Sequence, residues 1–145
     1  MKLYELAEEF SDLDPQEKLQ LLIEFSDTLP EPDRAELVKS RDESCRVQEC
    51  QTAVYLRALV NGGRVHVEAD VPRQSPTVRG LVAVVVEGLE GATPQQAAEM
   101  PDDVLTLLGL QETLGMTRQH GMRAVVARIK REIAQSACES VDGDG

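Results

Sequence analysis

Tryptophan is absent from this sequence of 145 residues, and aromatic side chains make up only 3% of it. Single-stranded nucleic acids bind mainly by stacking on aromatic side chains, so this function is excluded as the main one. Basic residues are also few: the sequence has 15 Lys and Arg and 26 Asp and Glu, which gives a net charge of -11. Phosphate backbones and anionic lipids attract positive charge, so we expect neither a nucleic acid nor a membrane as partner.

Long apolar runs are missing too, and none approaches the ~20 residues that a membrane-spanning helix requires. Residues 1–5 show no basic segment followed by an apolar stretch, so we expect no secretory signal and a cytoplasmic protein. The length predicts a single domain over residues 1–138, followed by a flexible acidic tail over 139–145. A hydrophobic content of 41% is typical of a globular fold.

Two helices are predicted near the N-terminus. The shorter one covers residues 4–10, and the longer one begins at Asp14-Pro15, where an N-cap residue precedes a proline suited to the first turn. Leu29-Pro30 ends this second helix. Its buried face is expected to consist of Leu19, Leu22, Ile23 and Ser26.

A β-hairpin is predicted in the middle of the chain. Residues 52–60 are rich in strand-forming side chains, residues 61–63 read Asn-Gly-Gly, and residues 64–70 alternate strictly between apolar and polar. Val65, Val67 and Ala69 should face the core, which leaves His66 on the solvated face.

Further helices are predicted over residues 77–89, 93–101 and 102–108, and over a long segment from a capping Thr117 to about residue 136. The first of them begins at Ser75-Pro76, is almost wholly apolar and should be the central buried helix, with Gly88 and Gly91 as stop signals. Helices around a small antiparallel sheet make an α+β fold.

The cysteines Cys45, Cys50 and Cys138 are odd in number, which argues against a disulfide framework. Cys45 and Cys50 could contribute to a metal site with His66 or His120, but a closed zinc site needs four ligands and commonly has tighter cysteine spacing. Cys50 directly precedes the first predicted strand, where a loop can hold a thiol rigidly and still expose it.

Residues 46–56, with Cys50-Gln51-Thr52 followed by Val54 and Tyr55, resemble the active-site segment of the SufE family. These are sulfur-acceptor proteins that partner cysteine desulfurases in iron–sulfur cluster assembly. Residues 75–85 and residues 108–122 resemble two further motifs of that family in the same order, and the resemblance spans residues 10–135.

The resemblance implies an α+β fold shared with iron–sulfur scaffold proteins and a role for each motif residue. Cys50 would accept persulfide sulfur beside Gln51, Arg118 would lie near the partner's active site, and Gly80 would occupy a tight packing position. The partners would be a pyridoxal-phosphate cysteine desulfurase and an iron–sulfur scaffold. The chain itself would need no cofactor or metal and would act as a stoichiometric sulfur-transfer partner; a homodimer is compatible with the sequence.

Glu49 departs from the family pattern, which has glycine before the cysteine. Its carboxylate disfavours the thiolate that sulfur transfer requires, and the loss of glycine stiffens the loop. A non-catalytic interaction domain with the same fold therefore stays open. An iron–sulfur or zinc scaffold that uses Cys45, Cys50 and a histidine is the second alternative.

Arg118 lies at the start of an apolar stripe along one side of the last predicted helix. At ~100° per residue, the apolar residues that follow it fall on its own side of the helix, which should aim Arg118 toward the body of the protein or let it extend from there to solvent. These residues are Met122, Val125, Val126, Ile129 and Ile133. The other basic residues, Arg123, Arg128, Lys130 and Arg131, are expected to form a solvated face.

Overall fold

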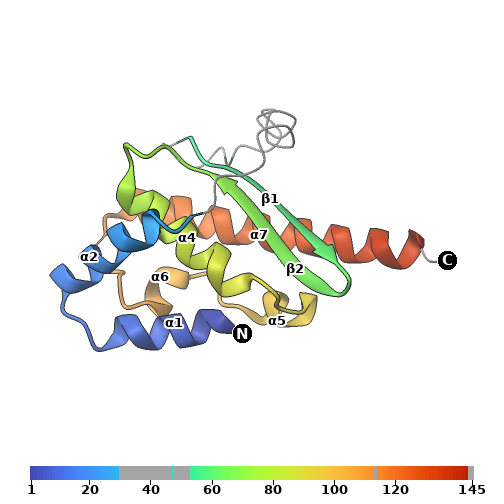
Figure 1. The fold of residues 1–145 in the computed structure, drawn as a ribbon, viewed down its shortest axis with the longest axis horizontal. Helices are drawn as coiled ribbons and strands as arrows, with labels where there is room; N and C mark the ends of the chain where they lie inside the picture. Colours follow the sequence, from blue (N-terminus) through green and yellow to red (C-terminus); the bar gives the residue numbers. More distant parts are fainter. Residues whose placement is uncertain (30–46, 48–52, 113, 144–145) are drawn as a thin grey trace.

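The computed structural model describes residues 1–29, 47, 53–112 and 114–143, with side chains up to residue 136. It confirms the predicted α+β class, since helices surround a two-stranded antiparallel sheet (Figure 1). The elements in chain order are α1 (Lys2–Ser11), α2 (Pro15–Ser26), β1 (Tyr55–Asn61), β2 (Arg64–Asp70), α4 (Pro76–Leu89), α5 (Pro94–Glu99), α6 (Val104–Leu107) and α7 (Met116–Gly143).

The hairpin of β1 and β2 forms as predicted, with pairing from Tyr55↔Asp70 to Asn61↔Arg64. Its two-residue turn consists of Gly62 and Gly63, whose φ angles of 60° and 76° suit glycine and the type I′ geometry of tight hairpins. β1 begins at Tyr55 rather than at residue 52, and the carbonyl of Val54 accepts a hydrogen bond from the Val47 N–H instead.

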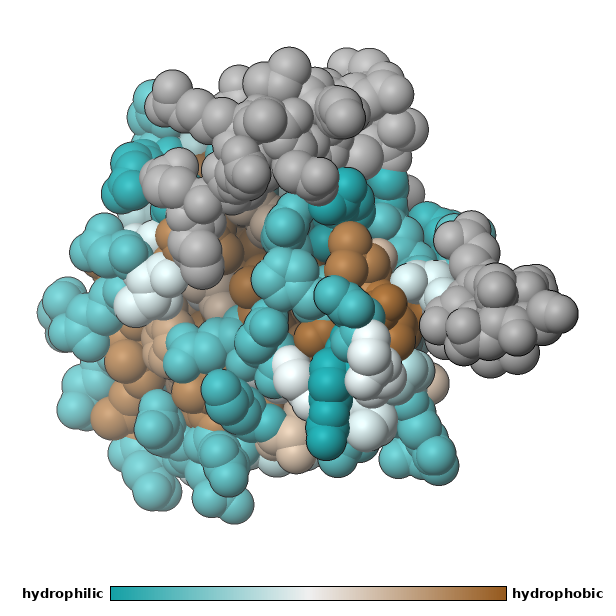
Figure 2. Space-filling view, turned by 45° about the vertical axis from the view of Figure 1, so that its right-hand side comes forward, coloured by the Kyte–Doolittle hydropathy of each residue, from teal (hydrophilic) through white to brown (hydrophobic). Residues whose placement is uncertain are grey.

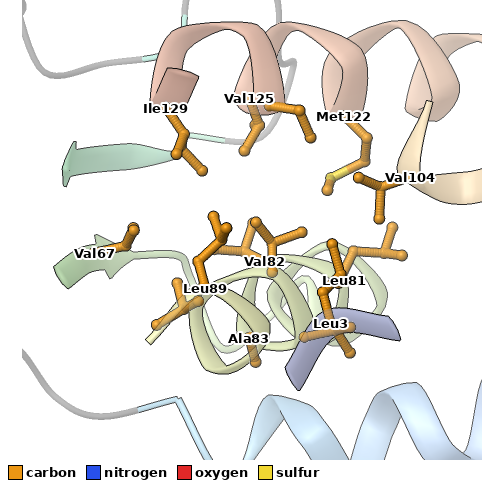
Figure 3. Close-up of a cluster of buried hydrophobic side chains, with 14 of the residues drawn as sticks. Leu3, Val67, Leu81, Val82, Ala83, Leu89, Val104, Met122, Val125 and Ile129 are labelled. Carbon is orange, nitrogen blue, oxygen red and sulfur yellow. The ribbon is translucent and has the colours of Figure 1, made fainter. Parts of the chain in front are cut away.

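Helix α4 lies at the centre of the molecule, as its apolar sequence predicted. Its side chains pack between those of α7 on one side and α1 on the other (Figure 3). Gly88 does not stop the helix; it lies inside α4, where an added Cβ would come 2.8 Å from the Cβ of Leu3. Pro76 occupies the first turn as expected, but the side chain of Ser75 makes no capping hydrogen bond.

Helix α2 begins at the predicted position. The Asp14 side chain accepts from the Glu17 N–H, and the Glu17 side chain accepts from the Asp14 N–H, which completes a capping box. The expected buried face is wrong at Ile23, which is 42% exposed, whereas Phe25 is buried beside Leu22. Phe25 stacks on Phe10 of α1.

Helix α7 begins at Met116, so Thr117 lies within its first turn and is not the cap. It continues to Gly143, beyond the expected end near residue 136, because neither glycine nor proline interrupts residues 122–142. Residues 139–143 therefore extend the helix, while the division into domain and tail stays a prediction. The helix lies along β1, where the Ser136 Oγ accepts from the Val60 N–H at 2.9 Å.

Hydrophilic residues make up much of the described surface seen in Figure 2, with areas of hydrophobic residues between them. Within the described ranges, none of the helices combines the length and apolar character needed to cross a membrane.

Candidate functional site

Cys50, Glu49 and Gln51 lie outside the described residues, and so does Cys45. The described residues on either side of them are anchored in the core: Val47 and Val54 are both 0% exposed. The Val47 N–H donates to the Val54 carbonyl at 2.9 Å. Three peptide units separate Cys50 from Val47, so chain length alone limits their Cα atoms to a separation of about 11 Å.

Both anchors lie at the open end of the hairpin. Val54 precedes Tyr55, whose partner Asp70 ends β2, and Val71 then leads into residues 72–75 and helix α4. The N-terminal ends of α4 and α7 lie at this same end of the molecule, opposite the Gly62-Gly63 turn (Figure 1). The two anchors of the thiol-bearing segment therefore lie at the same end of the molecule as the first turns of two helices.

Arg79 in α4 is a buried arginine at this end, only 4% exposed. Its Nε donates to the Ser26 carbonyl at 2.8 Å, and its two terminal nitrogens donate to the carbonyls of Val71 at 2.6 Å and Leu29 at 3.4 Å. Ser26 is the last residue of α2, so the guanidinium also places positive charge at the negative end of that helix dipole. The sequence carries one signal for this role, a basic residue inside an apolar helix.

Gly80 occupies the tight packing position that the resemblance implied. A Cβ on residue 80 would overlap the backbone carbonyl of Leu22 in α2. The absence of a side chain lets α2 and α4 approach at the point where the neighbouring Arg79 reaches the end of α2. Whether Gly80 supports a reaction stays a prediction.

A pocket of about 240 Å³ lies between the first turns of α4 and α7, and we call it the α4–α7 pocket. Its apolar lining includes Val78, Leu81 and Met122, and polar side chains such as that of Arg118 also line it. Two helix N-termini add partial positive charge there. The full lining is Gln74, Ser75, Pro76, Thr77, Val78, Leu81, Thr117, Arg118, Gly121 and Met122.

Arg118 lines this pocket and is exposed, so it lies at the surface of the body rather than within it. The apolar stripe below it is confirmed, because Met122, Val125 and Ile129 are all buried. Among the described residues, no carboxylate pairs with Arg118. Other basic groups of α7 do have partners: Arg123 with Asp103, Arg128 with Glu132 and Lys130 with Asp102.

The described histidines do not form a metal-binding cluster. His66 is half-exposed, and its two ring nitrogens lie 3.1 Å from a Glu90 oxygen and 3.4 Å from a Glu68 oxygen. His120 is exposed. In the part of the chain that the structure describes, no three His, Cys, Asp or Glu side chains are grouped to hold a metal ion.

Comparison with protein-family models matches residues 4–133 to SufE, described as an Fe-S metabolism associated domain. The chain belongs to the SufE family. An uncharacterised SufE-like protein of Mycobacterium tuberculosis is 33% identical over 135 residues, which cover 92% of each chain. A solution structure of a hypothetical protein from Thermus thermophilus superposes with a TM-score of 0.82 at 31% identity, covering 94% of this chain and 96% of that one.

One further relative carries a functional name. A cysteine desulfuration protein SufE of Plasmodium vivax is 27% identical over 90 residues, covering 61% of this chain and 37% of that protein. SufE-like protein 1 of Arabidopsis thaliana, named as chloroplastic/mitochondrial, is 31% identical over 123 residues, covering 83% of this chain and 32% of that protein. SufE membership confirms the predicted family and fold and supports a general sulfur-acceptor role in Fe–S metabolism.

Proposed function

We propose that this SufE protein accepts sulfur on Cys50 from a pyridoxal-phosphate cysteine desulfurase and passes it to an iron–sulfur scaffold in the cytoplasm. The observation that carries the proposal is the family match over residues 4–133, together with the Cys50-Gln51-Thr52 motif inside it. The buried anchors Val47 and Val54 support it, because they hold both ends of a short segment that must present a thiol.

The reaction is a thiol exchange without net oxidation or reduction. The Cys50 thiolate attacks the terminal sulfur of the persulfide R–S–SH on the desulfurase, and a new S–S bond forms as the donor's S–S bond breaks. The donor cysteine leaves as a thiolate, and the terminal sulfur keeps its proton, so the product is the persulfide of Cys50. The chain supplies the thiolate and its position, and the desulfurase supplies pyridoxal phosphate.

The α4–α7 pocket fits the docking of such a partner. Arg118 places an exposed guanidinium beside this small, partly apolar pocket. The pocket lies at the same end of the molecule as the open end of the hairpin, where Val54 follows the thiol segment. An acidic group of the desulfurase is the natural partner for that guanidinium. Arg118 would thus orient the donor persulfide. Gln51 would support the Cys50 loop, and Gly80 would support the packing of α2 on α4.

The test is stimulation of desulfurase turnover. Adding the wild-type chain to a purified cysteine desulfurase with L-cysteine should raise the rate of alanine formation in proportion to the chain added. Cys50→Ser should give no stimulation, whereas Cys45→Ser and Cys138→Ser should stimulate like the wild type. Equal stimulation by Cys50→Ser would refute the acceptor role.

Glu49 is the one observation that favours the alternative, a non-catalytic interaction domain. In that case the chain would bind the desulfurase and leave its turnover and the mass of Cys50 unchanged.

A further inference from the structure

Backbone carbonyls from two distant parts of the chain meet at one buried side chain, that of Arg79. Leu29 follows the end of α2, and its carbonyl accepts from Arg79. Val71 lies one residue beyond the Tyr55↔Asp70 pair that opens the hairpin, and its carbonyl also accepts from Arg79. The third carbonyl, that of Ser26, belongs to the end of α2. One guanidinium therefore joins α2, the hairpin and α4.

The position of this junction connects it to sulfur transfer. Val54, which holds Val47 by a backbone hydrogen bond, directly precedes the strand pair at the open end of the hairpin. Residues 72–75 run from Val71 to α4, and Gln74 and Ser75 line the α4–α7 pocket. Because Arg79 fixes the Val71 carbonyl to α4, it sets where the base of the thiol segment lies relative to the pocket and Arg118.

We propose that Arg79 is a positioning residue for sulfur transfer, which holds the base of the Cys50 segment at a fixed distance from the α4–α7 pocket. The proposal rests on the proposed function, since it assumes that Cys50 reacts with a docked persulfide. Arg79 acts through the backbone and touches neither donor nor acceptor sulfur. Lysine is not equivalent to it, because three donors spread over a planar group reach three separate carbonyls, whereas an ammonium offers a single nitrogen.

The test compares two sources of sulfur. A docked desulfurase persulfide needs Cys50 at a defined place, and a displacement of ~1 Å can slow such a step by about 100-fold. A small polysulfide in solution has no such requirement. We expect Arg79→Lys to slow loading from a desulfurase about tenfold or more. Loading of the same variant by sodium polysulfide should stay within about twofold of the wild type, because thiol–disulfide exchange depends on the thiolate and its access.

Arg64→Lys is the matched control. Arg64 is an exposed arginine that also donates to a backbone carbonyl, that of Gly91 at 3.0 Å, but it lies at the turn end of the hairpin. Its substitution should leave both loading rates unchanged. Circular dichroism and the melting temperature report whether each variant is folded. Arg79→Gln, which keeps a planar amide donor, is the second variant at the buried position.

The outcomes separate the two proposals. A wild-type chain that takes no sulfur from the desulfurase refutes the proposed function, and the role of Arg79 with it. A wild-type chain that loads, beside folded Arg79 variants that load equally fast from the desulfurase, overturns the positioning role alone. Equal slowing with both sulfur sources, or failure of both variants to fold, would make Arg79 a purely structural residue and would overturn it too.

Discussion

Gly80 of α4 lies against the backbone of Leu22 in α2 so closely that a Cβ on residue 80 would overlap the Leu22 carbonyl. The obstacle is backbone rather than a flexible side chain, so the two helices themselves would have to separate. That separation would also draw Arg79 away from the end of α2. The packing of α2 on α4 and the contacts of Arg79 with the end of α2 therefore depend on the same position, Gly80.

Gly80→Ala is expected to destabilise the protein by about 2 kcal/mol or more, since a methyl group forced into a packed core displaces its neighbours. Urea unfolding measures the change. Gly115→Ala is the control, because a Cβ there meets no atom within 4 Å. Gly115 lies at the start of α7, so Gly115→Ala is expected to lower the free energy of unfolding by less than about 1 kcal/mol. Equal losses in the two variants would contradict the close approach of α2 and α4.

Stability should fall in strongly acidic solution. A hydrogen bond from the Glu17 backbone N–H holds the pKa of Asp14 below its ordinary value, and a hydrogen bond with the Thr106 side chain does the same for Asp103. A lowered folded-state pKa stabilises the fold above the unfolded value, and this contribution is lost as pH falls through the folded value. The loss is expected below about pH 4.

Asp14→Asn tests this dependence, because asparagine keeps the N-cap acceptor and does not titrate. Urea midpoints between about pH 6 and pH 3 should show the wild type losing stability relative to the variant. A constant difference over that range would refute the role of the Asp14 carboxylate.

Arg118→Ala is expected to weaken stimulation of a cysteine desulfurase and leave stability unchanged, because the side chain is exposed and lines the α4–α7 pocket. We expect the chain concentration for half-maximal stimulation to rise about tenfold, equivalent to about 1.4 kcal/mol. Arg131→Ala removes another exposed arginine of α7 and should have no effect. Identical curves for the wild type and Arg118→Ala would exclude Arg118 from docking.

Glu49→Gln is expected to speed alkylation of Cys50 near neutral pH roughly threefold, because loss of a neighbouring negative charge favours the thiolate. The pH dependence of the iodoacetamide reaction, followed in a background of Cys45→Ser and Cys138→Ser, measures this effect. Glu49→Gly also adds backbone freedom. If Glu49→Gly speeds sulfur transfer and Glu49→Gln does not, flexibility rather than charge limits the wild type.

Local signals in the sequence were sufficient for much of the fold. The Gly62-Gly63 turn, the alternation of β2 and the N-cap at Asp14 each act over a few residues, and the structure confirms all three. The ends of elements were less accurate. Helix α7 passes its expected end in a stretch without glycine or proline, and the burial of Phe25, which stacks on Phe10 of another helix, is a contact that no pattern within α2 reports.

The candidate site depended more on contacts between distant residues. Arg79 reaches Ser26 and Leu29 across 53 and 50 positions of the chain, and no local pattern reports such a contact. Gly80 was identified through the family motif, and the close approach of Leu22 supplies its physical reason. Cys50, Glu49 and Gln51 lie outside the described residues, so their roles stay predictions from the sequence.

Sulfur acceptance by Cys50 is the central claim, and intact-protein mass spectrometry tests it most directly. The wild type and Cys50→Ser are incubated with a cysteine desulfurase and L-cysteine, and each mass is measured before and after a reductant. We predict added mass in whole sulfur atoms on the wild type alone, removed by the reductant. No added sulfur on the wild type, or equal addition to Cys50→Ser, would contradict the claim.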